Sequence, residues 1–133
     1  MSKDWVKDIH DMQTKYETRE WVKNNPEKLY DFLKFRIAFL QEELDETQAA
    51  YQRKDAEEIV DGLIDLCVVA IGTLDAYGVD PYKAWDEVLV ANMAKYIGIK
   101  ESRPNPLGMP DLAKPSDWKA PNHKGNHGKL NDI

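Results

Sequence analysis

The stretch DAEEIVDGLIDLCVVAIGTLDAYG, residues 55–78, decides the fold class of this chain. Asp55 is a good N-cap residue, and Glu58 follows three positions later, as in a capping box. Gly78 is typical of the left-handed residue that ends a helix. No proline interrupts the residues between these two signals. The stretch therefore predicts one long helix.

Three more helices are predicted, two before this one and one after it. Apolar residues spaced three and four apart predict helices over residues 3–16 and about 26–53. Asp80, with Pro81 in the first helical position, begins a fourth helix that we expect to end near Gly98. No segment alternates polar and apolar residues between hairpin turns, as strands do. The sequence therefore predicts an all-α protein, a four-helix bundle.

The helix over residues 55–78 is apolar on nearly every side in its second half. A helix of this kind has to be surrounded by other helices. Three partner helices in a small domain hardly cover every side, so we expect a homodimer or homotetramer with this helix near the subunit interface. The alternative is the central helix of a monomeric bundle. The residues concerned are Leu63, Ile64, Leu66, Cys67, Val68, Val69, Ala70, Ile71 and Leu74.

The composition excludes several classes of protein. With 18 Lys and Arg against 24 Asp and Glu, the net charge is −6, whereas general binders of nucleic acid need a basic surface. Metal ions can still bridge an acidic protein to a phosphorylated small molecule. One cysteine, Cys67, permits neither an internal disulfide nor a cysteine-based zinc site. The sequence shows neither a signal region nor a membrane span, so we expect a cytoplasmic protein without a membrane partner.

Residues 103–133 differ from the rest of the chain. They hold five of the seven prolines, show no helical period and have a net charge of +2 from five Lys and Arg and three Asp. We therefore expect a helical domain over residues 1–102, followed by an irregular tail rich in Pro and Gly. The tail either wraps over its own body or a neighbouring copy, or is mobile. Its spaced apolar residues are Leu107, Met109, Leu112 and Trp118.

Two groups of acids lie on either side of the short connection near residue 54. A connection this short makes the two flanking helices antiparallel neighbours, and residues three or four apart on a helix share one face. We therefore expect the two groups to face each other across the helix pair. The acids are Glu43 and Glu46 in the first group, and Glu58, Asp61 and Asp65 in the second.

Carboxylates brought together in this way need a cation. Their mutual repulsion raises their pKa values or pushes the helices apart unless a positive charge lies between them. Oxygen ligands without Cys or His suit a hard ion, Mg²⁺ first and Mn²⁺ second. Leu40 and Leu44, with Leu63 and Ile64, are expected to form an apolar seam that holds the acids at its edge. The alternative is an acidic face that is merely solvated.

At these positions the chain resembles a known family, the MazG-like all-α nucleoside triphosphate pyrophosphohydrolases. This group includes dimeric dUTPases, dCTP pyrophosphatases and phosphoribosyl-ATP pyrophosphohydrolases. Their paired ExxE and ExxD motif is similar to the two acidic groups, and their Asn-x-x-Lys signature is similar to residues 92–95. The resemblance spans roughly residues 28 to 98. The matching residues are Glu43, Glu46, Glu58, Asp61, Asn92 and Lys95.

The resemblance implies a role for each matching residue. The four acids are expected to be ligands of Mg²⁺, whereas Asn92 and Lys95 are expected to contact the triphosphate. The implied reaction cleaves the α–β phosphoanhydride of a nucleoside triphosphate, ribo or deoxyribo, and yields a nucleoside monophosphate and pyrophosphate. Members of the family are dimers or tetramers, which agrees with the apolar helix described above.

The roles of several other residues stay open at the level of the sequence. One of the acids Glu42, Glu46 and Asp65 could orient or deprotonate the attacking water. Arg36, two turns before the first acidic group, either reaches the phosphates or makes contacts within the fold. The first helix, with Trp5 on it, either closes over the base or packs as an ordinary amphipathic helix.

Two other functions are compatible with the same residues. Phosphoribosyl-ATP hydrolysis in histidine synthesis shares the acidic residues, although the Asn-x-x-Lys signature and the long tail favour the broader reaction. A non-catalytic helical module for oligomerisation or regulation would leave the acids as a solvated face. A rise in melting temperature with Mg²⁺ is expected for the enzyme and not for the module.

Overall fold

The computed structural model describes residues 3–99 and 107–133 and is mostly helical, so the predicted all-α class is confirmed. The chain forms two compact units. The first unit comprises Met1–Pro81 and His127–Ile133, and the second comprises Tyr82–Asn126. The boundary predicted near residue 102 falls outside the described residues and stays a prediction.

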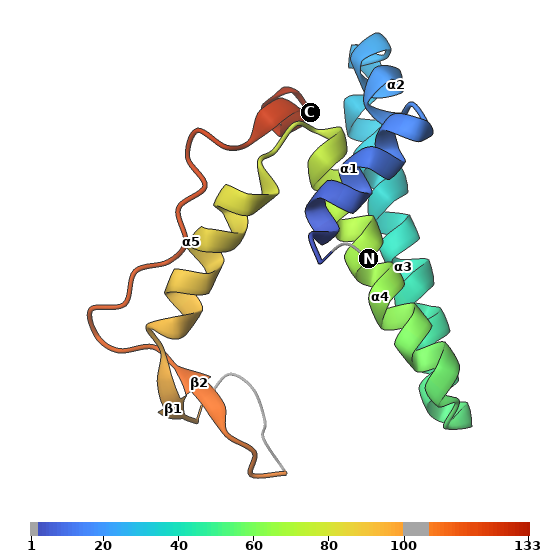
Figure 1. Ribbon diagram of the computed structural model, residues 1–133. Coiled ribbons are helices and arrows are strands. Elements are labelled where there is room, and N and C mark those ends of the chain that lie inside the picture. The colour runs from blue at the N-terminus through green and yellow to red at the C-terminus, as the bar shows by residue number, and fades with distance from the viewer. Residues whose placement is uncertain (1–2, 100–106) are drawn as a thin grey trace. The chain divides into compact units, whose positions relative to one another are not determined.

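Two long helices, α3 (Leu29–Arg53) and α4 (Ala56–Ala76), run side by side as the centre of the first unit (Figure 1). Lys54 and Asp55 connect them, and Lys54 has a left-handed conformation with φ at 58°. The N-cap of α4 forms as predicted, because the Asp55 side chain accepts a hydrogen bond of 3.1 Å from the Glu58 N–H. The two helices are therefore antiparallel neighbours, which the acidic site requires.

At Gly62, α4 lies close against Thr47 of α3. This glycine is buried, and a Cβ added to it would overlap Thr47 Oγ1 and lie 3.2 Å from Thr47 Cβ. The Thr47 hydroxyl donates a hydrogen bond of 2.8 Å to the Glu43 carbonyl one turn earlier on α3. The contact at Gly62 thus sets the spacing of the backbones at the level of the acids.

Shorter helices cover one end of this pair. Helix α1 (Trp5–Lys15) packs on α4, and α2 (Thr18–Asn24) packs on α1 and α4. The 3-10 helix η1 (Pro26–Lys28) leads into α3. The Tyr77 hydroxyl donates to the Leu29 carbonyl at 2.5 Å inside the core. The core residues are Val22, Leu29, Ala76, Tyr77 and Val79, with Phe32, Leu33, Leu74 and Leu130 packed against them.

Two predictions about this unit are wrong. Helix α2 is not among the predicted helices, because its seven residues are too few to show a helical period. The predicted apolar seam does not form either, since Leu44, Leu63 and Ile64 are exposed. The close approach at Gly62 leaves no room for leucines between the helices. Glycine and alanine predominate among the buried residues of the pair, which are Leu29 and Ala50 on α3 and Gly62, Val69, Gly72, Asp75 and Ala76 on α4.

The second unit contains α5 (Pro81–Met93) from its second residue on, and the strands β1 (Tyr96–Gly98) and β2 (Asp111–Ala113). The predicted fourth helix is therefore too long. Its last residues form β1, which pairs with β2 in antiparallel register, so that Tyr96 lies opposite Ala113. The partner strand comes from the tail, far along the chain, so local residue spacing could not reveal the pairing.

Parts of the tail pack on the helical body, which was one of the arrangements predicted for it. The Trp118 indole N–H donates a hydrogen bond of 2.7 Å to the Ala91 carbonyl on α5. The 3-10 helix η2 (Gly128–Asp132) lies in the first unit, where the Lys129 N–H donates to the Tyr77 carbonyl at 2.7 Å. In the described part of the chain, no helix combines the length and apolar character that crossing a bilayer demands.

Candidate active site

The acids of α3 and α4 meet beside the close contact of the two helices. Glu43 is half-buried there, and its Oε2 atom is buried without a hydrogen-bond partner among the described residues. An unpartnered oxygen of this kind costs free energy in the folded protein unless a ligand satisfies it. The acidic side chains that influence Glu43 electrostatically are Glu42, Glu46, Asp61 and Asp65.

The surroundings of Glu43 disfavour its charged form. Burial raises the pKa of the Glu43 carboxyl, and the negative charges of Glu46 and Asp65 raise it further. Glu42 and Asp61 add smaller effects in the same direction. Glu46 and Glu42 come from the same helix, whereas Asp61 and Asp65 come from α4. Acids of both helices therefore act on Glu43 electrostatically.

Asp65 belongs to the same cluster and takes a larger part in it than the sequence indicated. Burial raises the pKa of Asp65, and the charge of Asp61 and a hydrogen bond with it raise that pKa further. The signal for Asp65 was present in the sequence, since it follows Asp61 by one helical turn in an apolar stretch. The two Asp residues thus act together on α4.

Glu58 lies near the first turn of α4 and is exposed. Glu58 is not one of the described acids that raise the pKa of Glu43. Its backbone N–H is occupied by the N-cap contact with Asp55, while its carboxylate stands one turn before Asp61. Glu58 is therefore at the margin of the cluster, within reach of it only through the length of its side chain.

The donor set fits a hard divalent cation. Every side chain of the cluster is a carboxylate, and such oxygens are the ligands that Mg²⁺ and Mn²⁺ prefer. The buried Oε2 of Glu43 and the raised pKa values both indicate a place where positive charge is lacking. Across residues 3–99 and 107–133, no three such side chains already surround one point as metal ligands do. Binding would therefore require rotation of the exposed carboxylates.

Arg36 contacts α4 rather than the solvent. Its Nε donates to Thr73 Oγ1 at 2.9 Å, and one of its terminal nitrogens donates to the Val69 carbonyl at 3.0 Å. The guanidinium also lies 5.8 Å from the centre of the Phe39 ring. Burial lowers the pKa of Arg36 from its ordinary value. These contacts match the packing role, one of the two roles that the sequence left open.

Asn92 and Lys95 belong to the second unit. Asn92 is an exposed residue of the last turn of α5, and its carbonyl accepts a hydrogen bond of 3.2 Å from the Lys95 N–H. Lys95 is half-buried, with Nζ 5.4 Å from the centre of the Trp118 ring. The turn between them keeps both residues at the end of α5.

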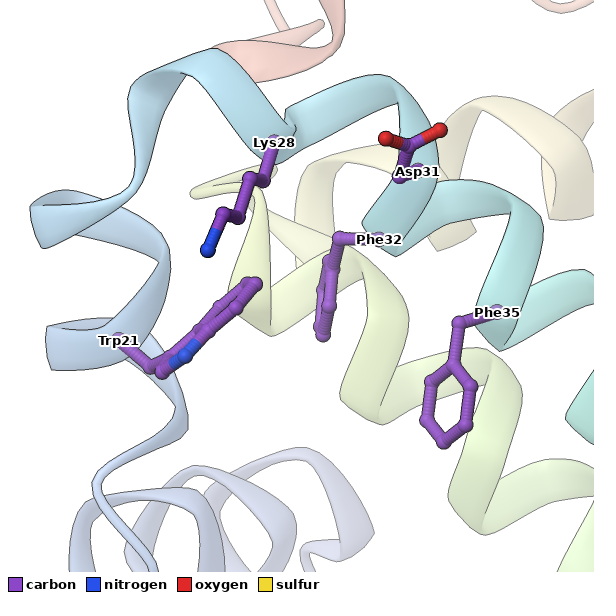
Figure 2. A pocket seen from close by; sticks show the side chains of 5 residues that line it. All are labelled: Trp21, Lys28, Asp31, Phe32 and Phe35. Carbon is purple, nitrogen blue, oxygen red and sulfur yellow. The ribbon is translucent and has the colours of Figure 1, made fainter.

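A pocket of 410 Å³ lies at the start of α3, lined by Trp21, Lys28, Asp31, Phe32 and Phe35. Figure 2 shows the rings of Trp21 and Phe32 beside the same space, with the Lys28 ammonium group pointing toward Trp21 and the Asp31 carboxylate pointing away from the rings. The ring centres of Trp21 and Phe32 are 5.5 Å apart. The sequence did not reveal this pocket, because Trp21 lies on α2, which was not predicted.

A second cavity, of 210 Å³, lies between α1 and α4 and includes Trp5 and Ile9. Other residues of α1 make packing contacts. Gln13 is buried and donates to the Gly72 carbonyl at 2.9 Å, and His10 Nδ1 lies 2.7 Å from Asp75 Oδ1. The cavity is smaller than the roughly 300 Å³ at which ligand pockets commonly begin, whereas the pocket on α3 exceeds it. The α3 pocket is therefore the better candidate for a base.

The comparisons with known proteins bear on the acidic cluster directly. Residues 11–92, more than half of the chain, match the family described as Phosphoribosyl-ATP pyrophosphohydrolase. No curated protein and no solved structure matches the chain. The matched region includes every acid of the cluster and ends at Asn92. The chain therefore belongs to the phosphoribosyl-ATP pyrophosphohydrolase family, and it is a hydrolase that acts on a phosphoanhydride of a nucleotide.

Proposed function

We propose that this protein hydrolyses a nucleoside or deoxynucleoside triphosphate between its α and β phosphates, with Mg²⁺ as cofactor and Mn²⁺ as a substitute. Water adds to one phosphorus of this anhydride, the bridging oxygen leaves, and the products are a nucleoside monophosphate and pyrophosphate. The observation that carries the proposal is the buried, unpartnered Oε2 of Glu43 among four other carboxylates. A cation bound there would satisfy this oxygen and attract the phosphates.

The proposed ligands of the cation are Glu43, Glu46, Glu58 and Asp61, with Asp65 as support for Asp61. When bound, the cation neutralises phosphate charge and lowers the pKa of water. Phosphoryl transfer asks the protein mainly for positioning and charge neutralisation, so few other groups are needed. Glu42 and Glu46 are exposed acids of the cluster, and we assign to one of them the orientation and deprotonation of the attacking water.

The phosphate contacts are proposed for Asn92 and Lys95. The ammonium group of Lys95 offers a point charge, and the amide of Asn92 offers two N–H donors to phosphate oxygens. Arg36 is a weaker candidate, because its donors already bind Thr73 and the Val69 carbonyl. A phosphate contact by Arg36 would have to replace these hydrogen bonds.

The aromatic pocket at the start of α3 is proposed to hold the base. Phe32 and Glu43 are eleven residues apart on α3, which is three turns, or roughly 16 Å, along one face. Base and phosphates are the two ends of a nucleotide, so a pocket and an acidic cluster along one helix face suit its extended form. Stacking on aromatic rings is worth about 1–3 kcal/mol per base.

Replacing Phe35 with Ala tests this pocket. Phe35 lines the pocket and is 63% exposed, so the change should remove stacking with little effect on stability. We expect KM to rise roughly tenfold with kcat within about a factor of two, because the stacking is lost equally from the ground state and the transition state. Tyr30→Ala is the control, since Tyr30 is a similarly exposed aromatic residue of α3 outside the pocket. An unchanged KM for Phe35→Ala would contradict the proposed pocket.

The main experiment measures pyrophosphate release from the common ribonucleoside and deoxynucleoside triphosphates, with and without Mg²⁺. Turnover of at least one of them, dependent on Mg²⁺, is expected. Phosphoribosyl-ATP is assayed beside them, since the family match makes it the second candidate substrate. Turnover of phosphoribosyl-ATP alone would replace the broader substrate by this one. The absence of turnover on every substrate would favour the non-catalytic module.

We also propose that the protein acts as a homodimer or homotetramer. The exposed apolar side chains Leu44, Val60, Leu63 and Ile64 lie on α3 and α4 near the acids. An unpaired apolar surface of this kind is costly in water, and a second copy of the chain would cover it. Sedimentation velocity should give at least twice the monomer mass of 15.3 kDa. Replacing Val60 and Leu63 with Glu should shift the protein toward the monomer, and a monomeric wild type would contradict the proposal.

A further inference from the structure

Two lysines face each other where the tail meets the end of α5. Tyr96 lies opposite Ala113 in the antiparallel pair of β1 and β2. One step beyond this pair, the same register sets Lys95 opposite Lys114. Like charges directly opposite each other on paired strands are destabilising. In the described part of the chain, neither lysine forms an ion pair with a carboxylate that would offset this repulsion.

Both lysines lie over one aromatic ring. The Nζ atom of Lys95 is 5.4 Å and that of Lys114 is 4.5 Å from the centre of the Trp118 ring. The hydrogen bond from the indole N–H to the Ala91 carbonyl attaches this ring to α5. The two ammonium groups are therefore at most about 10 Å apart and are held by a fixed platform.

We infer that Lys95, Lys114 and Trp118 form an anion-binding site for the phosphate chain of the substrate, an inference that rests on the proposed function. Lys114 is then a further substrate-binding residue, supplied by the tail, and Trp118 is a positioning residue. Two ammonium groups over one ring, at most about 10 Å apart, match an anion whose charges are spread along a chain better than a single phosphate. A polyphosphate would also remove the repulsion between the lysines.

Lys114→Gln tests the inference, with Lys119→Gln as its matched control. Lys119 is an exposed lysine of the same segment, five residues further on. The probe is inorganic tripolyphosphate, titrated calorimetrically into the full chain in metal-free buffer. We expect Lys114→Gln to weaken binding roughly tenfold, as for the loss of one charged hydrogen bond, and to make it less sensitive to salt. Lys119→Gln should stay within about twofold of the wild type.

Steady-state kinetics give the second measurement. Lys114→Gln should raise KM roughly tenfold and leave kcat within about twofold, because the contact is made in the ground state as well. Trp118→Leu should raise KM in the same way, since both lysines lose their platform. Trp118→Phe keeps an aromatic ring and should restore most of the affinity. If Trp118 served only in packing, replacing it would lower the stability of the protein without raising KM at a nearly unchanged kcat.

The outcomes separate this inference from the proposed function. If the wild type hydrolyses a nucleotide but Lys114→Gln behaves like Lys119→Gln in both measurements, the anion site is overturned and the proposed function stands. If the wild type hydrolyses no nucleotide but tripolyphosphate binding depends on Lys114, the proposed function fails and the anion site stands. If neither occurs, both fail.

Discussion

Glu43→Gln is expected to lower kcat by at least roughly 1,000-fold while the metal-free protein becomes no less stable. The amide is nearly isosteric with the carboxylate but carries no charge for a cation. In the metal-free protein, the change removes a charge that is disfavoured by burial and repelled by Glu46 and Asp65. A substitution that removes activity and leaves or raises the melting temperature is typical of a residue placed for a ligand rather than for packing.

Pyrophosphate release, far-UV circular dichroism and thermal melts with and without Mg²⁺ measure this outcome. Wild-type protein should melt at a higher temperature with Mg²⁺, and Glu43→Gln should lose that rise. Glu57→Gln is the control, because Glu57 is an exposed acid in the first turn of α4 and outside the cluster. It should keep both turnover and the response to Mg²⁺. Retained turnover in Glu43→Gln would remove the proposed metal site.

The pH dependence of stability gives an independent check on the same residue. The pKa values of Glu43 and Asp65 are raised in the folded protein, so folding favours their protonated forms. Their contribution to stability is present in full below about pH 4 and is lost as pH rises through the raised pKa values. In metal-free buffer, the melting temperature of the wild type should fall more than that of Glu43→Gln as the pH rises above about 4. Equal falls would contradict the assignment.

Gly62→Ala is expected to destabilise the protein by about 2 kcal/mol, although alanine favours a helix by about 1 kcal/mol over glycine. The added methyl group overlaps Thr47 Oγ1 and comes within 3.2 Å of Thr47 Cβ, so α3 and α4 have to move apart. The movement separates the two halves of the acidic cluster. We therefore also expect turnover to fall, by roughly 10- to 100-fold, since positioning supplies much of the catalysis.

Urea unfolding and pyrophosphate release measure both effects of Gly62→Ala. Gly72→Ala is the control on the same helix, because its Cβ would meet the ends of the Arg36 and Gln13 side chains, which can shift. It should cost much less stability than Gly62→Ala. The double variant Gly62→Ala with Thr47→Ala should recover part of the loss, because the hydroxyl that overlaps is gone. Full additivity of the two changes would show that Thr47 is not the obstacle.

The acidic cluster was largely predictable, because it depends on residues that are close together in the sequence. Acids three and four apart on two helices joined by two residues are expected to lie on the same side of the pair. The contribution of each acid was less predictable. Asp65 raises the pKa of Glu43 more than the sequence indicated, whereas Glu58 lies at the margin of the cluster. These differences depend on which turn of α3 meets which turn of α4.

Arg36 and Trp21 show where local reasoning ends. Two roles for Arg36 were open because a guanidinium reaches phosphates and backbone carbonyls equally well, and only its neighbours on α4 select between them. Trp21 lies on a helix of seven residues, too short to show a period, so the pocket that it forms with Phe32 was hidden. Both residues act through contacts with distant parts of the chain.

By itself, the sequence determined that the chain is helical, that Asp55 is the N-cap of α4, and that the acids flank one connection. These features depend on neighbours within four residues, which every helix brings together. Only the tertiary structure decided that Gly62 lies against Thr47, that Glu43 Oε2 is buried without a partner among the described residues, and that the tail pairs with the segment after α5. The physical reason is that packing and strand pairing join residues far apart along the chain, whose spacing in sequence carries no periodic signal.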